Sequence, residues 1–281
     1  MTWRVIDLEG CDIYQMHAAE DYFLHEVNQG NHPPTLLFSR LLRPALSLGI
    51  MQNLVKDVDL EEVAALDVDL TRRRTGGRSV YLDQQHYILS IIDRKKNHVS
   101  DVRAYHEKCT TIIDTLFEVT GTHFFLCHRN DIMTREGRKV GGVAQMSMGY
   151  AYLVHCYLRH TADLDTMLRL IKIDGVKLAR YKSEFATFTG SLEQEAGISW
   201  NDFSSSFRER FVETLDEVSS TPLTSAEREG IEKIAEGRYK NVSVIHGTGD
   251  EPSRGNCDLI IGSGEQALLR IPNLEGKVNF R

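Results

Sequence analysis

Residues 71–83 constrain this chain most, because they set two adjacent glycines, Gly76 and Gly77, among four arginines that fall within seven residues. Adjacent glycines permit backbone angles that other residues avoid, and they let a ligand approach the main chain closely. Successive backbone N–H groups can then form a concavity for an anion, and arginine side chains supply charged donors for phosphate or carboxylate oxygens. A solvated surface turn is the alternative. Residues 68–71 and 87–92 predict strands on either side, so we expect a sheet to frame this loop.

The same segment excludes the common nucleotide-binding motifs. It contains neither the Gly-x-x-x-x-Gly-Lys of a P-loop nor the Gly-x-Gly-x-x-Gly of a dinucleotide fold. If it binds phosphate, it does so by another arrangement. We refer to residues 73–79 as the glycine loop.

A second candidate segment contains Asn130 and Asp131, followed by Lys139, Val140 and a glycine pair ending at Gly142. A lysine that projects from a strand beside glycines can neutralise a carboxylate or the phosphate of an acyl-adenylate, which would stabilise charge during acyl transfer. The alternative for Lys139 is an exposed hairpin tip. This segment therefore indicates a functional site only in combination with the glycine loop.

The remaining pattern predicts an α+β fold with a mixed, largely antiparallel sheet flanked by helices, because strands and helices alternate irregularly and hairpins occur between 131 and 158. Apolar spacing predicts helices at 14–27, 102–119, 164–171, 200–218 and 225–238. Residues 35–39 and 45–50 suggest an antiparallel pair. We expect one main domain over residues 1–245 and a small C-terminal β appendage over 246–281.

Composition narrows the function. A net charge of −7 argues against a general nucleic-acid binder or a protein that binds anionic membranes, since both reward a basic surface. No apolar run is long enough to span a bilayer and no leader is visible, so we expect a cytoplasmic protein. The five cysteines and eleven histidines show no metal-binding spacing, and we expect neither disulfides nor a tightly bound metal.

Taken together, the two segments resemble the lipoate-protein ligase and octanoyltransferase family of the biotin/lipoate protein ligase superfamily. The resemblance runs from the first strand through His155, and more weakly to about Lys240. The matching positions are Arg72, Arg73, Thr75, Gly76, Gly77, Val80, Asp83, Asn130, Asp131, Lys139, Val140 and Gly142.

This resemblance implies an acyl-attachment enzyme in which Lys139 is the central catalytic contact. ATP would be a co-substrate, lipoate or octanoate the acyl substrate, and Mg²⁺ an ion held near Asp131. The acceptor would be a lipoyl-domain protein, such as the E2 subunit of a 2-oxoacid dehydrogenase or the H protein of glycine cleavage. The implied contacts to ATP and acyl-adenylate are Arg72, Arg73, Gly76, Gly77, Arg78, Ser79, Val80, Tyr81, Asp83, Asn130, Asp131, Gly142 and His155.

Three departures from the family pattern affect what it implies. Arg78 replaces the third glycine of the loop, which looks like the octanoyltransferase branch, and Leu82 replaces the histidine before Asp83. The tail after about Lys240 does not resemble the accessory domain that some ligases carry. A separate accessory subunit is therefore a further expected partner.

The resemblance does not decide whether the chain is a ligase or a transferase. In the transferase branch a cysteine upstream of the lysine is the nucleophile, and Cys127 is the candidate, with His128 or His155 as its base. The uninterrupted spacing from Cys127 to Asp131 fits the ligases, which favours an ATP-dependent lipoate-protein ligase. The first alternative is a transferase that uses Cys127 to move an octanoyl or lipoyl group from an acyl carrier protein or another lipoyl domain. The second is a non-catalytic subunit that binds lipoate or a lipoyl domain. A biotin ligase is disfavoured, because its Gly-Arg-Gly-Arg loop is missing.

Overall fold

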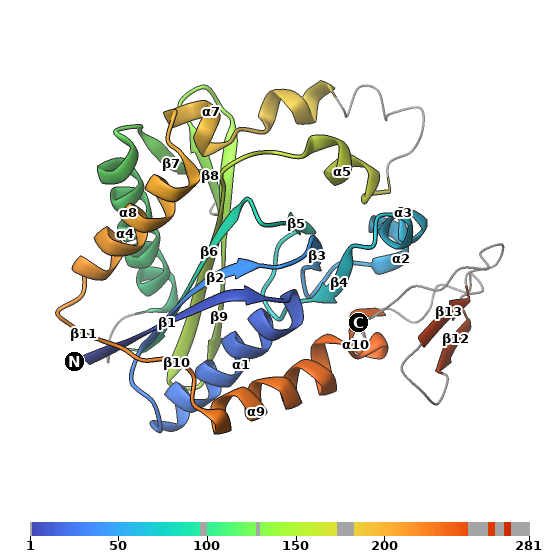
Figure 1. Ribbon diagram of the computed structural model, residues 1–281, viewed down its shortest axis with the longest axis horizontal. Coiled ribbons are helices and arrows are strands. Elements are labelled where there is room, and N and C mark those ends of the chain that lie inside the picture. Colours follow the sequence, from blue (N-terminus) through green and yellow to red (C-terminus); the bar gives the residue numbers. More distant parts are fainter. Residues whose placement is uncertain are drawn as a thin grey trace.

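The computed structural model describes residues 2–95, 100–127, 130–172 and 183–246, together with the backbone of 258–261 and 267–270. This part of the chain is built around a sheet of eight strands in the order β11-β1-β2-β6-β10-β9-β8-β7 (Figure 1). β11 and β2 run parallel to β1, and the other neighbours are antiparallel. The predicted α+β class is confirmed. The strands are β1 Thr2–Cys11, β2 Thr35–Leu41, β6 His86–Arg94, β7 Phe124–Cys127, β8 Asp131–Thr134, β9 Lys139–Met148, β10 Ala151–Arg159 and β11 Glu217–Ser220.

Two long helices, α4 (Asp101–Thr120) and α8 (Trp200–Glu213), cover one face of this sheet (Figure 1). α4 begins where the Ser100 side chain accepts a hydrogen bond from a backbone N–H, and it ends at Gly121 in the left-handed conformation, with φ 67°. α8 buries three phenylalanines spaced one turn apart, which are Phe203, Phe207 and Phe211. Both helices are held in position by an apolar stripe of side chains that packs against the sheet.

The opposite face is covered by α1 (Ile13–Gln29), which packs in turn against α9 (Ser225–Ile234). Each begins with a reciprocal capping box, made by Asp12 with Gln15 and by Thr224 with Glu227. α9 continues into the π-helical turn η1 (Ala235–Tyr239). The remaining named helices are α2 Leu54–Asp57, α3 Leu60–Ala65, α5 Leu164–Arg169, α7 Leu192–Ala196 and α10 Val242–His246.

A second sheet holds the glycine loop. Its order is β4-β3-β5, with β3 at Ala45–Leu48, β4 at Asp69–Arg72 and β5 at Val80–Leu82. The predicted pairing of 35–39 with 45–50 is wrong, because β2 pairs with β1 and β6 whereas β3 pairs with β4 and β5. Pro44 separates the two strands and has no N–H to continue a ladder, so the chain passes from one sheet to the other there.

The predicted helix 200–218 is too long, since α8 ends at Glu213 and 217–220 form the edge strand β11. Pairing with the open edge of β1 satisfies backbone groups there and overrides local helix propensity. At the C-terminal end, β12 (Asp258–Ile261) pairs antiparallel with β13 (Ala267–Arg270), within the segment expected to form a small β appendage. The rest of the tail lies outside the described residues, and the domain boundary near 245 stays a prediction. None of the helices in the described ranges has the length and apolarity required to span a bilayer.

A buried ion pair joins β1 to α9. The Arg4 guanidinium makes two hydrogen bonds to the Glu227 carboxylate, one of them from Nη2 to Oε2 at 2.9 Å, and also donates to the Thr221 hydroxyl. The hydrogen bonds from Arg4 lower the pKa of Glu227 to about 2, below its usual value of 4.5. This stabilisation is therefore present above about pH 4.5 and is lost as pH falls towards 2.

Replacing Arg4 with Met should lower the free energy of unfolding by about 3 kcal/mol, because it leaves a buried carboxylate without its partner. The matched control is Arg208→Met, which removes a more exposed pair to Asp7 on the same strand and should cost about 1 kcal/mol or less. Equilibrium urea denaturation at pH 7 measures both values. Equal losses in the two variants would contradict the structural role given to Arg4.

Candidate active site

A cavity of about 640 Å³, including its open mouth, lies between the large sheet and the glycine loop. Eleven residues expected at the site line it, namely Arg73, Gly76, Gly77, Arg78, Ser79, Val80, Asn130, Asp131, Lys139, Gly142 and His155. Nine further residues complete the wall, namely Met16, His17, Ser47, Leu82, Ile88, Val143, Ala144, Cys156 and Tyr157. The structure thus brings the two sequence segments together around one cavity.

The glycine loop is closed around the side chain of Arg73. Arg73 Nη2 donates to the carbonyls of Gly76 and Arg78 at 2.8 and 2.7 Å. Gly77 has a φ of 93°, which is costly for any residue with a side chain. Gly49 lets the loop approach β3, because a Cβ built there would lie 2.0 Å from the Gly77 carbonyl oxygen. The loop is therefore a braced part of the wall.

Arg72 lies on the other side of β4 and does not line the cavity. It is fully buried, and its guanidinium donates to five carbonyl oxygens, which belong to Gly49, Ile50, Gln52, Ile245 and His246. These bonds join α10 to the second sheet. Arg72 was expected among the nucleotide contacts, but it lies behind the cavity wall.

Two other expected contacts, Tyr81 and Asp83, also lie outside the cavity wall. Asp83 Oδ1 is 2.8 Å from His86 Nδ1, a fully buried histidine. Burial alone would raise the pKa of Asp83, but hydrogen bonds, first that from His86, lower it. The Tyr81 ring packs edge-on against His86. These residues stabilise the end of β5 rather than facing a ligand.

Lys139 stands in the cavity wall as a paired cation. Its Nζ lies 2.6 Å from Asp131 Oδ1 across the β8–β9 pair. Burial would lower the pKa of Lys139, but the Tyr157 phenol and the Asp131 carboxylate overcome this and raise it. Lys139 is therefore a charged ammonium at neutral pH, held in the wall of the cavity.

A row of directly opposed residues crosses the sheet at this level. Cys127 pairs with Asp131, Asp131 with Gly142, and Gly142 with Tyr157. Residues directly opposite one another project their side chains to the same face and lie about 5 Å apart. Cys127 does not line the cavity, but its side chain is on the cavity face, one strand beyond Asp131. Gly142 leaves space for Tyr157, since a Cβ there would lie 2.9 Å from Tyr157 Cε1.

Cys127 differs from the other described cysteines in its environment. Cys11, Cys109 and Cys156 are buried, and burial raises the pKa of each thiol, to about 11 for Cys109. Cys127 is only partly buried, at the end of the edge strand β7. Of the two expected bases, His128 lies outside the described residues, and both ring nitrogens of His155 already have hydrogen-bonding partners.

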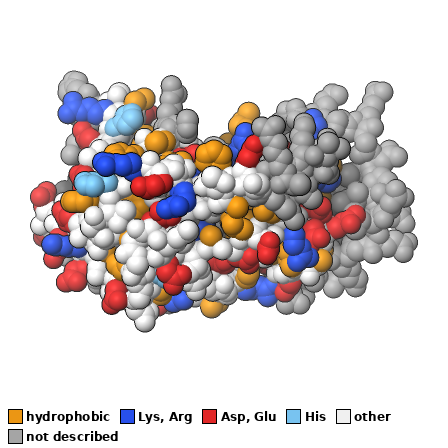
Figure 2. All heavy atoms as spheres, turned by 90° about the horizontal axis from the view of Figure 1, so that it is seen from above, with side chains coloured by type: hydrophobic (Ala, Val, Ile, Leu, Met, Phe, Trp, Pro, Cys, Tyr) orange, Lys and Arg blue, Asp and Glu red, His pale blue; other side chains and the backbone are white. Residues whose placement is uncertain are grey.

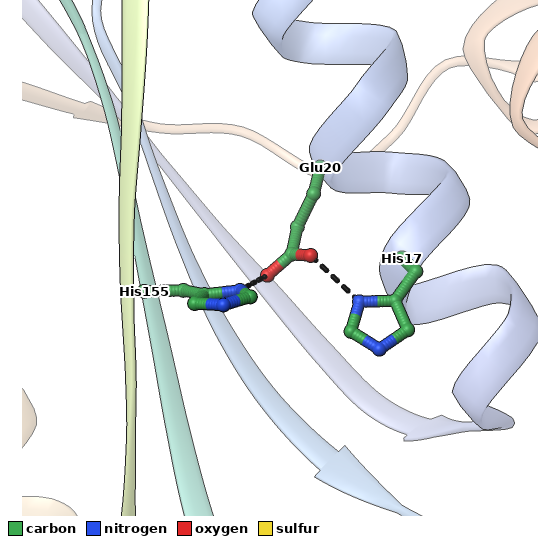
Figure 3. A group of neighbouring side chains, drawn as sticks. All are labelled: His17, Glu20 and His155. Atoms are coloured by element: carbon green, nitrogen blue, oxygen red, sulfur yellow. Dashed lines mark hydrogen bonds and ion pairs between the residues drawn. The ribbon is translucent and has the colours of Figure 1, made fainter. Parts of the chain in front are cut away.

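A buried carboxylate behind the cavity, that of Glu20, was not predicted from the sequence. Glu20 of α1 lies between His17 and His155, with its two carboxylate oxygens directed at the two rings (Figure 3). Donor atoms of the three lie within 4.8 Å of one another, as a metal site would require, yet hydrogen bonds within the protein account for every ring nitrogen. The i,i+3 spacing of His17 and Glu20 on one helix was the only signal available in the sequence.

On the face shown in Figure 2, acidic and basic side chains of the described residues are interspersed with apolar ones. The concentrated basic groups that the sequence shows at Arg72 to Arg78 are partly turned inward, because Arg72 and Arg73 are buried.

Known proteins are similar to most of the length of this chain. The family model described as the lipoyl protein ligase A/B catalytic domain matches residues 12–212. Octanoyltransferase LipM from Oceanobacillus iheyensis is 24% identical over 262 residues, which cover 86% of this chain and 96% of that protein. Octanoyltransferase LipM from Moorella thermoacetica is 42% identical over 84 residues, which cover 30% of this chain and 31% of that protein. Lipoate-protein ligase 1 from Staphylococcus aureus is 25% identical over 246 residues, which cover 82% of this chain and 65% of that protein.

Solved structures share the fold. A bipartite lipoate protein ligase from Thermoplasma acidophilum, described with its E2 lipoyl domain, superimposes with a TM-score of 0.78 at 19% identity, covering 90% of this chain and 99% of that one. A lipoate-protein ligase A bound with ATP gives a TM-score of 0.76 at 20% identity, covering 88% and 99%. At these identities the likeness establishes the fold and not the reaction.

Thiol labelling tests the placement of Cys127. Brief treatment of the native protein with iodoacetamide should alkylate Cys127 at least about tenfold faster than Cys11, Cys109 or Cys156, because the thiolate is the reactive form and burial suppresses it in the other three. Peptide mass spectrometry measures each site, with the urea-unfolded protein as the control for intrinsic reactivity. Equal labelling of Cys127 and Cys156 in the native protein would refute this placement.

Proposed function

We propose an activity for this chain from the premise that it belongs to the lipoyl protein ligase A/B catalytic domain family, whose model matches most of its length. The proposed activity is octanoyl transfer from an acyl carrier protein to a specific lysine of a lipoyl domain, through a thioester on Cys127. The sequence analysis favoured an ATP-dependent ligase and gave this transferase as its alternative. The near full-length similarity to an octanoyltransferase supports reversing that order.

The observation that carries the proposal is the cross-strand row that ends at Cys127. It sets a partly buried thiol on the same face as the Lys139 and Asp131 pair, at the edge of the sheet where a large carrier can approach. Arg78, in place of the third loop glycine, also fits the transferase branch. A ligase that forms a free acyl-adenylate would have no need of a thiol at this position.

The first chemical step forms the acyl-enzyme. The Cys127 thiolate attacks the octanoyl carbonyl, the bond from that carbon to the carrier sulfur breaks, and the carrier leaves as a thiol with the proton that Cys127 gave up. The Lys139 ammonium, which is paired with Asp131 of this row, would stabilise the oxyanion.

The second step releases the product. The amine of the lipoyl-domain lysine attacks the Cys127 thioester, the carbon–sulfur bond breaks, and an amide forms while the amine proton returns to the Cys127 sulfur. Asp131 would keep Lys139 charged and directed at the carbonyl through both steps. The acyl tail would occupy the apolar part of the wall formed by Met16, Ile88 and Val143.

The second candidate remains the lipoate-protein ligase, supported by the similarity to a ligase from Staphylococcus aureus. Asn130 and Asp131 carry amide and carboxylate oxygens, which are ligand types that Mg²⁺ prefers, so the described cavity residues fit such an ion. Bound Mg²⁺ would neutralise charge on a departing pyrophosphate. Asp131 would then have to leave Lys139, to which it is directly paired.

The acceptor is proposed as the lipoyl domain of an E2 subunit or an H protein. One solved relative is described as bipartite and together with its E2 lipoyl domain. A separate accessory subunit, which the sequence analysis expected, belongs with the ligase candidate. The transferase proposal needs none.

A two-donor assay decides between the candidates. Wild-type protein is incubated with apo lipoyl domain and either octanoyl carrier protein without ATP, or octanoate or lipoate with ATP and Mg²⁺, and the acceptor mass is followed. We expect transfer from the carrier alone, at least about a 1,000-fold loss in Cys127→Ala because nucleophile removal abolishes the covalent route, and about a 100-fold loss in Lys139→Ala. Cys11→Ala, which removes a buried thiol outside the cavity wall, is the matched control.

The other outcomes are equally distinct. Transfer only from free acid with ATP, unaffected by Cys127→Ala, would establish the ligase and overturn the proposal. Ligand binding without turnover from either donor would also overturn it, in favour of the non-catalytic subunit that the sequence analysis kept as its last alternative.

A further inference from the structure

The carboxylate of Glu20 is the centre of a buried hydrogen-bonded network. It accepts from His17 Nδ1 at 2.8 Å, from His155 Nδ1 at 2.7 Å and from the Ser90 hydroxyl at 2.6 Å (Figure 3). Glu20 itself is not part of the cavity wall, whereas both histidines are. Three elements, α1, β10 and β6, are therefore joined at one side chain behind the ligand site.

Both histidines also make hydrogen bonds to the second sheet and its glycine loop. His155 Nε2 lies 3.0 Å from the Thr75 hydroxyl, and Arg73 Nε donates to that same oxygen at 3.1 Å. His17 Nε2 lies 2.9 Å from the Ser47 hydroxyl, and Arg73 Nη1 donates to the Ser47 carbonyl at 2.7 Å. Arg73 thus closes a ring that starts and ends at Glu20.

Both histidine rings direct an Nδ1 at Glu20, which as a carboxylate can only accept. The two histidines lower the pKa of Glu20 despite its burial, and burial lowers the pKa of His17, so Glu20 is ionised and His17 neutral at pH 7. Each Nδ1 then donates to Glu20, and the neutral His17 ring accepts at Nε2 from the Ser47 hydroxyl. None of the ring's polar atoms is among the described buried groups without a partner.

The ring also contains the positive charge of Arg73 and the negative charge of Glu20, and Arg73 holds the glycine loop. Arg73 is buried and none of the described carboxylates is within ion-pairing distance of it, and burial lowers its pKa to about 10, an effect that the Tyr157 phenol and Glu20 oppose. The same guanidinium holds the loop through Nη2, by its bonds to the carbonyls of Gly76 and Arg78. Removing the charge of Glu20 would therefore act on the loop through Arg73.

We propose that Glu20 is a positioning residue that fixes the glycine loop through this ring, without touching the ligand. The consequence for activity rests on the proposed function, in which the loop binds the acyl donor, but the consequence for the loop itself does not. Two arginines make the loop measurable, because Arg74 is partly exposed and Arg78 exposed, and trypsin can cleave after either once the segment opens.

The experiment uses limited trypsin digestion of the full chain without any ligand, with cleavage after each arginine followed by mass spectrometry. Glu20→Gln keeps the size of the side chain but removes the charge and one acceptor. Thr75→Val removes only the hydroxyl at the far side of the ring, and Thr75→Ser retains it. Glu227→Gln is the control for loss of stability. Glu227 is a second buried glutamate, and neither it nor its partner Arg4 lines the cavity.

We expect cleavage after Arg74 or Arg78 to become at least about tenfold faster in Glu20→Gln and Thr75→Val, since each loses hydrogen bonds within a network that involves charged groups. Thr75→Ser and Glu227→Gln should stay near the wild-type rate at these bonds. Cleavage after Arg103, an exposed residue of α4, should be the same in all five proteins and serves as the internal standard.

With substrates present, the Glu20→Gln and Thr75→Val proteins should show a raised KM for the acyl donor, and Thr75→Ser should restore it. Loop cleavage that stays at the wild-type rate in both Glu20→Gln and Thr75→Val would overturn the proposal. If Glu20→Gln does not fold, the Thr75 pair decides alone. Faster loop cleavage in a protein that transfers no octanoyl group would uphold the ring and reject the proposed function, so the two failures are distinguishable.

Discussion

The folding of the glycine loop around the Arg73 guanidinium is the contact on which the site depends. A buried arginine is costly unless its donors are satisfied, and here backbone carbonyls and the Thr75 hydroxyl satisfy them. This requirement fixes the path of the chain between β4 and β5. It also places Gly76, Gly77 and Arg78 in the cavity wall, where an acyl donor or a phosphate would be held.

The second determinant is the register of the large sheet. Because directly opposed residues share a face, the pairing of β7, β8, β9 and β10 collects Cys127, Asp131, Gly142 and Tyr157 on the cavity side. A shift of one residue in any of these pairs would turn a member of the row to the face covered by α4. The apolar residues of that other face, such as Ile132 and Phe124, therefore help to specify the position of the thiol.

The sequence predicts those parts of the site that are local. The glycine loop and the Asp131 and Lys139 segment were identifiable, because their chemistry lies within a few consecutive residues and matches a family pattern. It could not show that Arg73 faces the cavity while Arg72 faces away, since adjacent side chains at the end of a strand point in opposite directions and both were arginines. It also could not bring His17, Glu20 and His155 together, because only the packing of α1 on the sheet places them side by side. The antiparallel pairing wrongly predicted for 35–39 and 45–50 has the same origin: strand partners are chosen by tertiary packing.

The most direct test of the proposed thioester is a pulse experiment on the protein without its acceptor. Wild-type protein is mixed with octanoyl carrier protein, quenched in acid, digested and examined by peptide mass spectrometry. We expect an octanoyl thioester, released by hydroxylamine, on the peptide that contains Cys127. Absence of any acylated peptide, together with an acyl-adenylate formed from octanoate and ATP by the same preparation, would contradict the assignment of Cys127 as the nucleophile.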